Sequence, residues 1–335
     1  MNLTYVEARF KNVQVQLASR PTYRVAIEVL MFGLLYVIGF VGNAVVLWIV
    51  NKKKNEGKAI YLFIGALAFS DILMVVLSSV TSLMVRVLGK WPFSDTICQF
   101  QGFLVVFLAT VSLLLMAGTA VNRYFQVVRT NFYRLIFTPM HTRLLVGGIW
   151  VLASIAPIQY VAIGERYIFH PGKCFCFQEN SFKPSTLFVS VIVFIPMCFI
   201  IASYYKVFKT IQSHKHRVAN MQNNADSIAG PNIQDVKVTR TLFVTVVGFL
   251  CCWTPILIMD LIEFARGILF LPRELYILYS WLGLLSTVIN PLIYGVMNPM
   301  FREEYKKILR IRSTGWVTEG NHIEVEQEVR SRKVG

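Results

Sequence analysis

Apolar residues occur along this chain in long blocks rather than in the short alternations of a water-soluble core. Seven blocks have few or no charged side chains and reach the roughly 20 residues that an α-helix needs to cross about 30 Å of hydrocarbon. Because backbone groups in lipid must hydrogen-bond within the protein, each block is predicted to be a membrane-spanning helix. The blocks cover residues 25–50, 59–86, 97–122, 143–164, 184–206, 238–260 and 274–299.

Composition agrees with this pattern. Hydrophobic residues make up 55% of the 335 residues and charged residues 15%, a balance unlike that of soluble globular proteins. The net charge of +15 is compatible with nucleic-acid binding, but the excess Lys and Arg lie beside the ends of the blocks, where anionic lipid attracts them. We therefore expect membrane lipid, and no nucleic acid, as a partner. The predicted fold is an all-α membrane protein, a seven-transmembrane helix bundle.

The distribution of Lys and Arg predicts the orientation of the bundle. They are concentrated in the segments between blocks 1 and 2, 3 and 4, and 5 and 6, and after block 7, with Lys52, Lys53 and Lys54 as the first examples. The positive-inside rule makes these segments cytoplasmic, so the N-terminus is extracellular and the C-terminus cytoplasmic. A glycosylation sequon at Asn2 agrees with this orientation. We expect a multi-pass protein of the plasma membrane.

Four regions follow from the blocks and their flanks. After block 7, the apolar residues Phe301, Tyr305, Ile308 and Leu309 share one helical face, which predicts a short amphipathic helix on the cytoplasmic membrane surface. The polar tail beyond it is predicted to be flexible. The regions are an extracellular N-terminal segment (1–24), the helix bundle (25–299), the amphipathic helix (300–312) and the cytoplasmic tail (313–335).

Three of the six cysteines are predicted to face the oxidising side of the membrane. Cys98 lies at the outer start of block 3, and Cys174 and Cys176 lie in the loop between blocks 4 and 5. A disulfide can form and persist in such a compartment. One bridge from Cys98 to Cys174 or to Cys176 would hold this loop over the bundle, and the sequence does not choose between the two.

Asp71 lies near the middle of block 2, where a bare carboxylate costs about 3 kcal/mol or more. An ionisable residue at that depth is a candidate functional site that could hold a monovalent cation or take up a proton. The alternative is a protonated aspartate that only joins neighbouring helices. Polar residues of blocks 1, 3 and 7 could complete the site, namely Asn43, Ser112, Ser286, Thr287 and Asn290.

The inner ends of the blocks carry a second polar set. Arg123 ends block 3, and Asp235 precedes block 6 as a possible ion-pair partner; such a pair would act as a latch between two helices. Tyr204 and Tyr294 lie at similar depth. Pro255 and Pro291 each free a backbone carbonyl four residues earlier, which bends the helix and makes a hinge candidate.

Together these residues resemble the rhodopsin-like (class A) G-protein-coupled receptors over roughly residues 25–312. Each motif is weak alone, but the ordered set is specific. The motifs are Gly42-Asn43, "LAFSD" ending in Asp71, Trp91 and Cys98, Asn122-Arg123-Tyr124, Trp150, Pro196 with Tyr204, Cys252–Pro255 and "NPLIY" at Asn290–Tyr294.

The resemblance implies a receptor without enzymatic activity that binds an extracellular ligand and activates heterotrimeric G proteins by outward movement of the sixth helix. Arrestin and a receptor kinase are further implied partners. The implied activation switch comprises Asn122, Arg123, Tyr124, Asp235, Tyr204, Phe249, Trp253, Pro255, Asn290, Pro291 and Tyr294. The implied allosteric sodium and water site comprises Asn43, Asp71, Ser112, Ser286 and Asn290.

Departures from the family pattern narrow the range of ligand classes that this chain is expected to bind. Asn122 replaces the usual aspartate, a variant shared with melatonin receptors, but block 5 lacks the histidine associated with indole binding there. Val105 stands where amine receptors carry an aspartate, so a small protonated amine would have no counter-ion at that depth. Leu284 stands at the retinal-linking lysine of opsins, so no covalent retinal is expected.

The implied pocket has an apolar floor below two acids, Asp260 and Glu263. Such a pocket suits a peptide with a basic or amidated end, or a neutral lipophilic molecule. An opsin-related receptor without the lysine, and a transporter or channel, are the alternatives; a transport path would require more intramembrane charges than Asp71. The expected lining is Val105, Val106, Ala109, Phe188, Ile192, Trp253, Ile256, Leu257, Asp260, Tyr276, Ser280 and Leu284.

Overall fold

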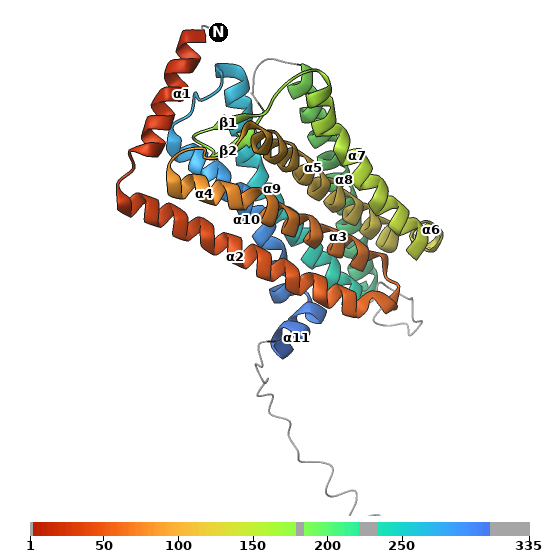
Figure 1. Cartoon of the computed structure of the whole chain (residues 1–335). Helices are drawn as coiled ribbons and strands as arrows, with labels where there is room; N and C mark the ends of the chain where they lie inside the picture. The colour runs from red at the N-terminus through yellow and green to blue at the C-terminus, as the bar shows by residue number, and fades with distance from the viewer. Residues whose placement is uncertain (1–2, 179–183, 221–232, 309–335) are drawn as a thin grey trace, which may run out of the picture.

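The computed structural model describes residues 3–178, 184–220 and 233–308 (Figure 1). Within them the chain is almost entirely helical, with one two-stranded sheet. The elements are α1 (Leu3–Ala18), α2 (Thr22–Lys53), η1 (Lys54–Glu56), α3 (Ala59–Leu73), η2 (Met74–Ser79), α4 (Val80–Leu88), α5 (Asp95–Val128), α6 (Thr130–Ile136), α7 (Pro139–Ala162), β1 (Ile168–His170), β2 (Phe175–Phe177), α8 (Pro184–Asn220), α9 (Ile233–Arg266), α10 (Arg273–Met297) and α11 (Pro299–Ile308).

The described residues contain seven helical segments that are long and apolar enough to cross a membrane, as predicted. They pack side by side in one bundle, with α1 and the sheet at one end, called here the hairpin end, and α11 at the other (Figure 1). Large apolar side chains such as Leu30, Val151, Phe194 and Val296 point outward and are mostly exposed. Hydrocarbon is the solvent that such a surface requires.

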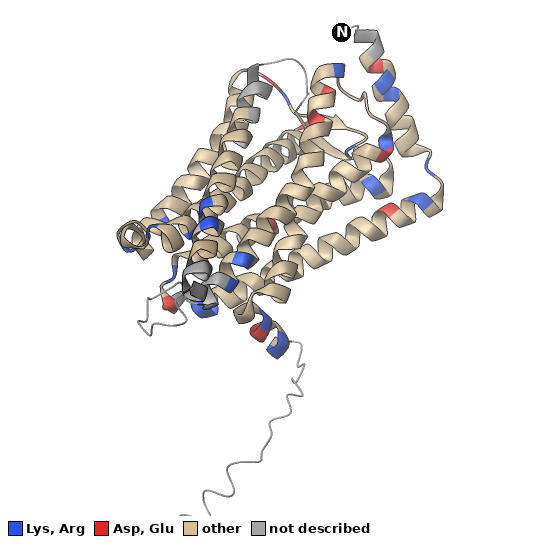
Figure 2. Cartoon of the chain, turned by 180° about the vertical axis from the view of Figure 1, so that it is seen from behind, with Lys and Arg blue, Asp and Glu red and all other residues tan. Residues whose placement is uncertain are grey.

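Charged residues lie mainly toward the ends of the spans, while the middle of the bundle is largely uncharged (Figure 2). At the α11 end, Lys52 of α2 pairs with Glu304 of α11 at 2.8 Å. Phe301 is fully buried, and its ring lies 5.4 Å from that of Tyr294. The short helix after the last span is therefore fixed to the bundle by both packing and charge.

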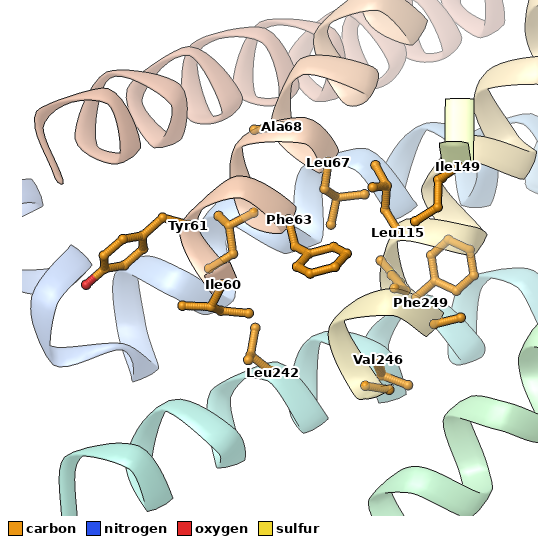
Figure 3. Packing of buried hydrophobic residues seen from close by; sticks show 14 of the residues in the cluster. Ile60, Tyr61, Phe63, Leu67, Ala68, Leu115, Ile149, Leu242, Val246 and Phe249 are labelled. Atoms are coloured by element: carbon orange, nitrogen blue, oxygen red, sulfur yellow. The ribbon is translucent and has the colours of Figure 1, made fainter. Parts of the chain in front are cut away.

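The core of the α11 half is a continuous apolar cluster (Figure 3). Phe63 of α3 and Leu115 of α5 are fully buried at its centre, and Val246 and Phe249 of α9 extend it toward the middle of the bundle. One cluster shared by α3, α5 and α9 couples the positions of these helices, because close-packed interiors transmit strain.

The second span is not one regular α-helix. Between α3 and α4, residues Met74–Ser79 form the π-helical stretch η2, which the sequence analysis did not predict. A π-helical turn carries an extra residue, so it rotates the following side chains relative to a continuous α-helix. Ser78 and Ser82 are buried within the bundle as a result.

The N-terminal segment forms a helix, α1, that caps the hairpin end (Figure 1). Leu17 is fully buried against Val85 of α4 and Cys174, and the Arg9 guanidinium donates to the carbonyl of Phe270 at 2.5 Å. Arg20 ties the end of α1 to the bundle, because it donates to Glu28 at 2.6 Å. No element was expected in residues 1–24.

A β-hairpin covers the bundle beneath α1. Strands β1 and β2 are antiparallel, with Ile168 opposite Phe177 and His170 opposite Phe175. A disulfide joins Cys98 at the start of α5 to Cys176 in β2, which decides the pairing that the sequence left open. Cys174 is a free, buried thiol.

The hairpin also depends on a close approach to α5 at Gly102. A Cβ atom added there would lie 2.4–2.6 Å from Tyr167, just before β1. Gly147 in the interior of α7 has open space around the same position. The two glycines therefore form a matched pair for testing the contact.

We predict that Gly102→Ala lowers the free energy of unfolding by about 1–3 kcal/mol, because Tyr167 must move out of a packed site. Gly147→Ala should be neutral or raise it by up to about 1 kcal/mol, because alanine favours the helix. The melting temperatures of the two purified variants in detergent check this. Equal values would show that the approach at Gly102 is not tight.

Candidate functional site

An apolar cavity of about 160 Å³ lies inside the bundle, below the hairpin. Its walls come from α2, η2, α4, α5, β2, α8, α9 and α10. The expected residues that line it are Val105, Val106, Ala109, Trp253, Ile256, Leu257, Asp260, Ser280 and Leu284.

Other expected pocket residues lie elsewhere. The Tyr276 hydroxyl donates to Glu263 at 2.6 Å, so this side chain supports the acid rather than lining the cavity. Ile192 packs on the cluster that contains Cys98, Val106 and Tyr160, outside the cavity. The side chain of Phe188 lies outside the described residues.

The cavity also has a polar wall that the sequence analysis missed. Ser78, Ser79 and Ser82 of the second span and Thr110 of α5 line it. The hydroxyls of Ser82 and Thr110 donate to backbone carbonyls one turn earlier, at 3.4 and 2.8 Å, which leaves their oxygens available as acceptors. The periodicity of a regular α-helix does not predict that these serines face the cavity, because η2 rotates the side chains that follow it.

The roof of the cavity is charged. Lys173, in the turn between β1 and β2, is fully buried, and its Nζ atom lies 3.2 Å from Asp260 Oδ1 and 2.9 Å from Glu263 Oε2. The same Nζ lies 4.7 Å from the ring centroid of Phe177 and 4.2 Å from that of Tyr279, within range of cation–π attraction. Burial opposes its charge, but the two carboxylates outweigh burial and raise the pKa of Lys173, so its amine is protonated.

His170 lies beside this charge cluster and is buried. Its Nδ1 atom accepts a hydrogen bond from the backbone N–H of Lys173 at 3.1 Å, and its Nε2 atom lies 3.3 Å from Glu263 Oε1. Since Nδ1 accepts, the ring proton is on Nε2 and points at the carboxylate. Burial lowers the pKa of His170 despite the attraction of Glu263, so the ring is neutral.

Glu263 has further donors around it. Its Oε1 atom accepts from the Tyr276 hydroxyl and, at 3.0 Å, from the backbone N–H of Leu269. Asp260 accepts from the Tyr279 hydroxyl at 3.0 Å. The two acids expected above the apolar floor thus belong to one polar network, in which Glu263 is fully buried and Asp260 is partly exposed. The sequence alone could not predict this network, because nothing in it pairs Lys173 with these acids.

Asp71 is buried in the middle of the bundle and accepts a hydrogen bond from the amide of Asn290 at 2.9 Å. Ser112 is nearby on α5 and lies 3.2 Å from the hydroxyl of Ser70. Two other expected members bond elsewhere: Asn43 donates to the carbonyls of Gly39 and Thr287, and Ser286 donates to that of Gly283. The hydrogen bond from Asn290 to Asp71 therefore joins the second and seventh spans.

The switch residues at the α11 end are buried. Arg123 is 1% exposed and donates to Gln126 Oε1 at 2.6 Å, and Tyr204 and Tyr294 are also buried. The side chain of Asp235, the expected partner of Arg123, lies outside the described residues. Asn122 is fully buried, and within the described part of the chain its amide has no hydrogen-bond partner.

Farther up the bundle, the Phe249 and Trp253 rings are stacked, with centroids 5.4 Å apart, one turn from Pro255. Both rings line the cavity. Pro291 of α10 is buried beside the position that Gly42 occupies in α2. Tyr124 is half-buried and lies under Lys206, whose Nζ is 5.5 Å from the ring centroid.

The family model of the 7 transmembrane receptor (rhodopsin family) matches residues 42–294. The chain belongs to this family. The family consists of receptors rather than enzymes, in agreement with the seven spans, the disulfide and the ordered motifs.

Individual relatives are distant. The neuromedin-K receptor of Cavia porcellus is 27% identical over 300 residues, which cover 87% of this chain and 67% of the relative. The melatonin receptor type 1A of Ovis aries is 26% identical over 313 residues, which cover 91% of this chain and 84% of the relative. The neuromedin-K receptors of Oryctolagus cuniculus and Homo sapiens are covered to 63%, so the chain spans under two thirds of their length.

A solved structure shares the fold. The crystal structure of squid rhodopsin superposes with a TM-score of 0.73 at 20% sequence identity, over 87% of each chain. At that identity the likeness concerns the arrangement of the helices alone. It does not extend to the ligand.

His170 makes the stability of the receptor sensitive to pH. In the unfolded chain a histidine takes up a proton near pH 6.5, whereas the folded ring does so only at lower pH. Stability should therefore fall as pH drops below about 6.5, by up to about 1.4 kcal/mol per pH unit from this group. His170→Gln should flatten that dependence.

Melting temperatures of the purified protein between pH 7.5 and 5 measure the effect. His141→Gln is the matched control, because His141 is exposed and should leave the wild-type profile unchanged. If His170→Gln and the wild type lose stability in parallel, the folded histidine is not held neutral.

Proposed function

We propose that this receptor binds an extracellular ligand in the cavity below the hairpin and activates heterotrimeric G proteins at its α11 end. The observation that carries the proposal is the position of the cavity. Its floor is the Phe249–Trp253 stack, one turn from Pro255 in α9. A ligand in the cavity would thus contact the helix whose movement opens the opposite end.

The proposed orientation puts the hairpin end outside the cell and the α11 end in the cytoplasm. The disulfide between Cys98 and Cys176 supports it, because such bonds persist in oxidising compartments. Lys52, Lys306 and Lys307 at the α11 end support it through the positive-inside rule. Arrestin and a receptor kinase are further proposed partners at this end.

The proposed ligand is a peptide or a neutral lipophilic molecule. Relatives are named for neuromedin-K, substance P, 5-hydroxytryptamine and melatonin, so their names include peptides and small molecules. Val105 offers no counter-ion to a small amine at its depth, and Leu284 offers no amine for a Schiff base with retinal. Both residues line the cavity as apolar surface.

Activation is proposed as a population shift between two arrangements of α9. In the resting form α9 lies close to Arg123, and in the active form it swings outward around Pro255 and uncovers the arginine. An agonist favours the active form only by binding it more tightly than the resting form. Tyr204 and Tyr294, buried at the same end, would reorient as α9 leaves.

A sodium ion is proposed as an allosteric ligand near Asp71. The buried carboxylate and the carbonyl oxygen of Asn290, which has no hydrogen-bond partner in the described chain, are oxygen donors of the kind that a hard cation prefers. Ser112 is a further donor in the proposal. Sodium bound there would favour the resting arrangement by linking the second, third and seventh spans.

Nucleotide exchange on purified G proteins tests the function. We expect the receptor in nanodiscs to accelerate exchange on at least one G-protein class when given the best agonist from a panel of peptides and neutral lipophiles. Arg123→Gln should reduce that rate at least about tenfold, because the helix of the G protein that enters the opened end would lose its contact with the arginine. Arg129→Gln, the same change at an exposed position, should retain it. Equal loss in both variants would contradict the role of Arg123.

The sodium proposal is tested without any agonist. The wild-type melting temperature should be higher in sodium chloride than in choline chloride, with a gain of about 3 kcal/mol when sodium is a hundredfold above its Kd. Asp71→Asn should abolish the difference, because it removes the charge that binds the ion. A sodium effect that persists in this variant would place the ion elsewhere.

A further inference from the structure

The two acids above the cavity already hold a cation that belongs to the protein. Lys173 Nζ contacts both Asp260 and Glu263, and the side chain is fully buried under the hairpin. Of these three residues only Asp260 lines the cavity, so a ligand there meets a carboxylate that is already paired with the Lys173 ammonium group behind it. The acidic subsite that the sequence suggests for a basic ligand is occupied from within.

We propose that Lys173 is a built-in cation that fills this acidic subsite, so the cavity selects a neutral lipophilic ligand and rejects a cationic amine or the basic end of a peptide. The inference rests on the proposed function only in taking this cavity as the ligand site. Under this inference Lys173, a residue of the loop, determines which ligand charge the cavity accepts.

The lysine is held in place by its backbone as well as by its charge. Its N–H donates to His170 Nδ1 at 3.1 Å, and its carbonyl accepts from the Ser280 hydroxyl of α10 at 2.6 Å. Three residues later, the disulfide from Cys176 to Cys98 anchors the strand to α5. These bonds keep the turn in place, and an incoming cation would have to break both ion pairs of the Lys173 side chain in order to replace it at the acids.

The acids are held just as firmly. Tyr276 and Tyr279 donate to Glu263 and Asp260, and both tyrosines belong to α10. Gly172, next to Lys173, allows the turn to approach α10, since a Cβ there would lie 2.4 Å from the Tyr276 ring. The hairpin turn, α9 and α10 thus meet at one network of ion pairs and hydrogen bonds.

The cavity beneath presents different chemistry. Its walls are mostly apolar, and the polar lining consists of several hydroxyls, Gln178 and the paired Asp260. The hydroxyls of Ser82 and Thr110 already donate to backbone carbonyls. Their remaining lone pairs accept hydrogen bonds. The complementary ligand is an apolar body with a neutral donor, such as a hydroxyl or an amide N–H.

A matched pair of photoactivatable probes tests the inference directly. The probes are alkyl diazirines of equal length, one ending in a hydroxyl and the other in a primary amine. The purified receptor in nanodiscs is irradiated with each, and cross-links at cavity residues such as Val105 and Leu284 are measured by mass spectrometry. The readout is binding alone, so it remains valid if the receptor activates no G protein.

In the wild type we expect the hydroxyl probe to label the cavity and the amine probe to label it at least about tenfold less. Lys173→Ala leaves Asp260, which lines the cavity, without its ammonium partner, so labelling by the amine probe should rise by about tenfold or more. Lys173→Ala/Asp260→Asn should lose most of that gain. Lys90→Ala, which removes an exposed lysine near the same end, should behave as the wild type.

Several outcomes would overturn the inference. Equal labelling by both probes in the wild type would show that Lys173 does not exclude cations. Absence of hydroxyl-probe cross-links in the wild-type cavity would show that the cavity does not take neutral lipophiles. If a folded Lys173→Ala variant is labelled by the amine probe no more than the wild type is, then Lys173 does not determine which ligand charge the cavity accepts. If that variant does not reach the membrane, the comparison of the two probes in the wild type decides alone.

Discussion

The hydrocarbon environment is the constraint on which the structure depends. Backbone groups that face lipid must find their partners within the same segment, so the chain crosses as helices and leaves irregular backbone for the two ends. The exception is η2, where Met74–Ser79 depart from α-helical geometry inside the bundle. One face of that stretch lies beside the cavity, where Ser78 and Ser79 line the wall, whereas Val76 and Leu77 on the other face are exposed.

The same constraint explains why two groups of buried charges at the hairpin end combine acids with basic side chains. A lone ion in the bundle would lose its hydration without compensation, whereas an ion held by opposite charge and hydrogen bonds is tolerated. Lys173 with Asp260 and Glu263 is one such group, and Arg20 and Arg273 with Glu28 form another beneath α1. Both groups join a segment outside the spans to the bundle. The hairpin end is therefore closed by electrostatics as much as by packing.

The sequence predicted what depends on composition and order, and missed what depends on side-chain geometry. Seven spans, the family and the apolar lining residues such as Val105 and Leu284 follow from block length and from position within motifs. The α1 cap, η2 and the role of Lys173 do not, because each depends on contacts between residues far apart in the chain. Tyr276 was placed in the pocket from its depth alone, yet its hydroxyl turns to Glu263.

The paired acids show how the same residues support different functions. Read from sequence, Asp260 and Glu263 are separated by three positions near a helix end and indicate attraction for a basic ligand. In the structure both acids are directed at Lys173, so one ammonium group offsets part of the field that two bare carboxylates would impose on the cavity. A pocket with that roof distinguishes ligands mainly by shape and by neutral hydrogen bonds. In this proposal the hairpin turn sets the charge of the ligand, and the residues of the spans that line the cavity set its shape and neutral hydrogen bonds.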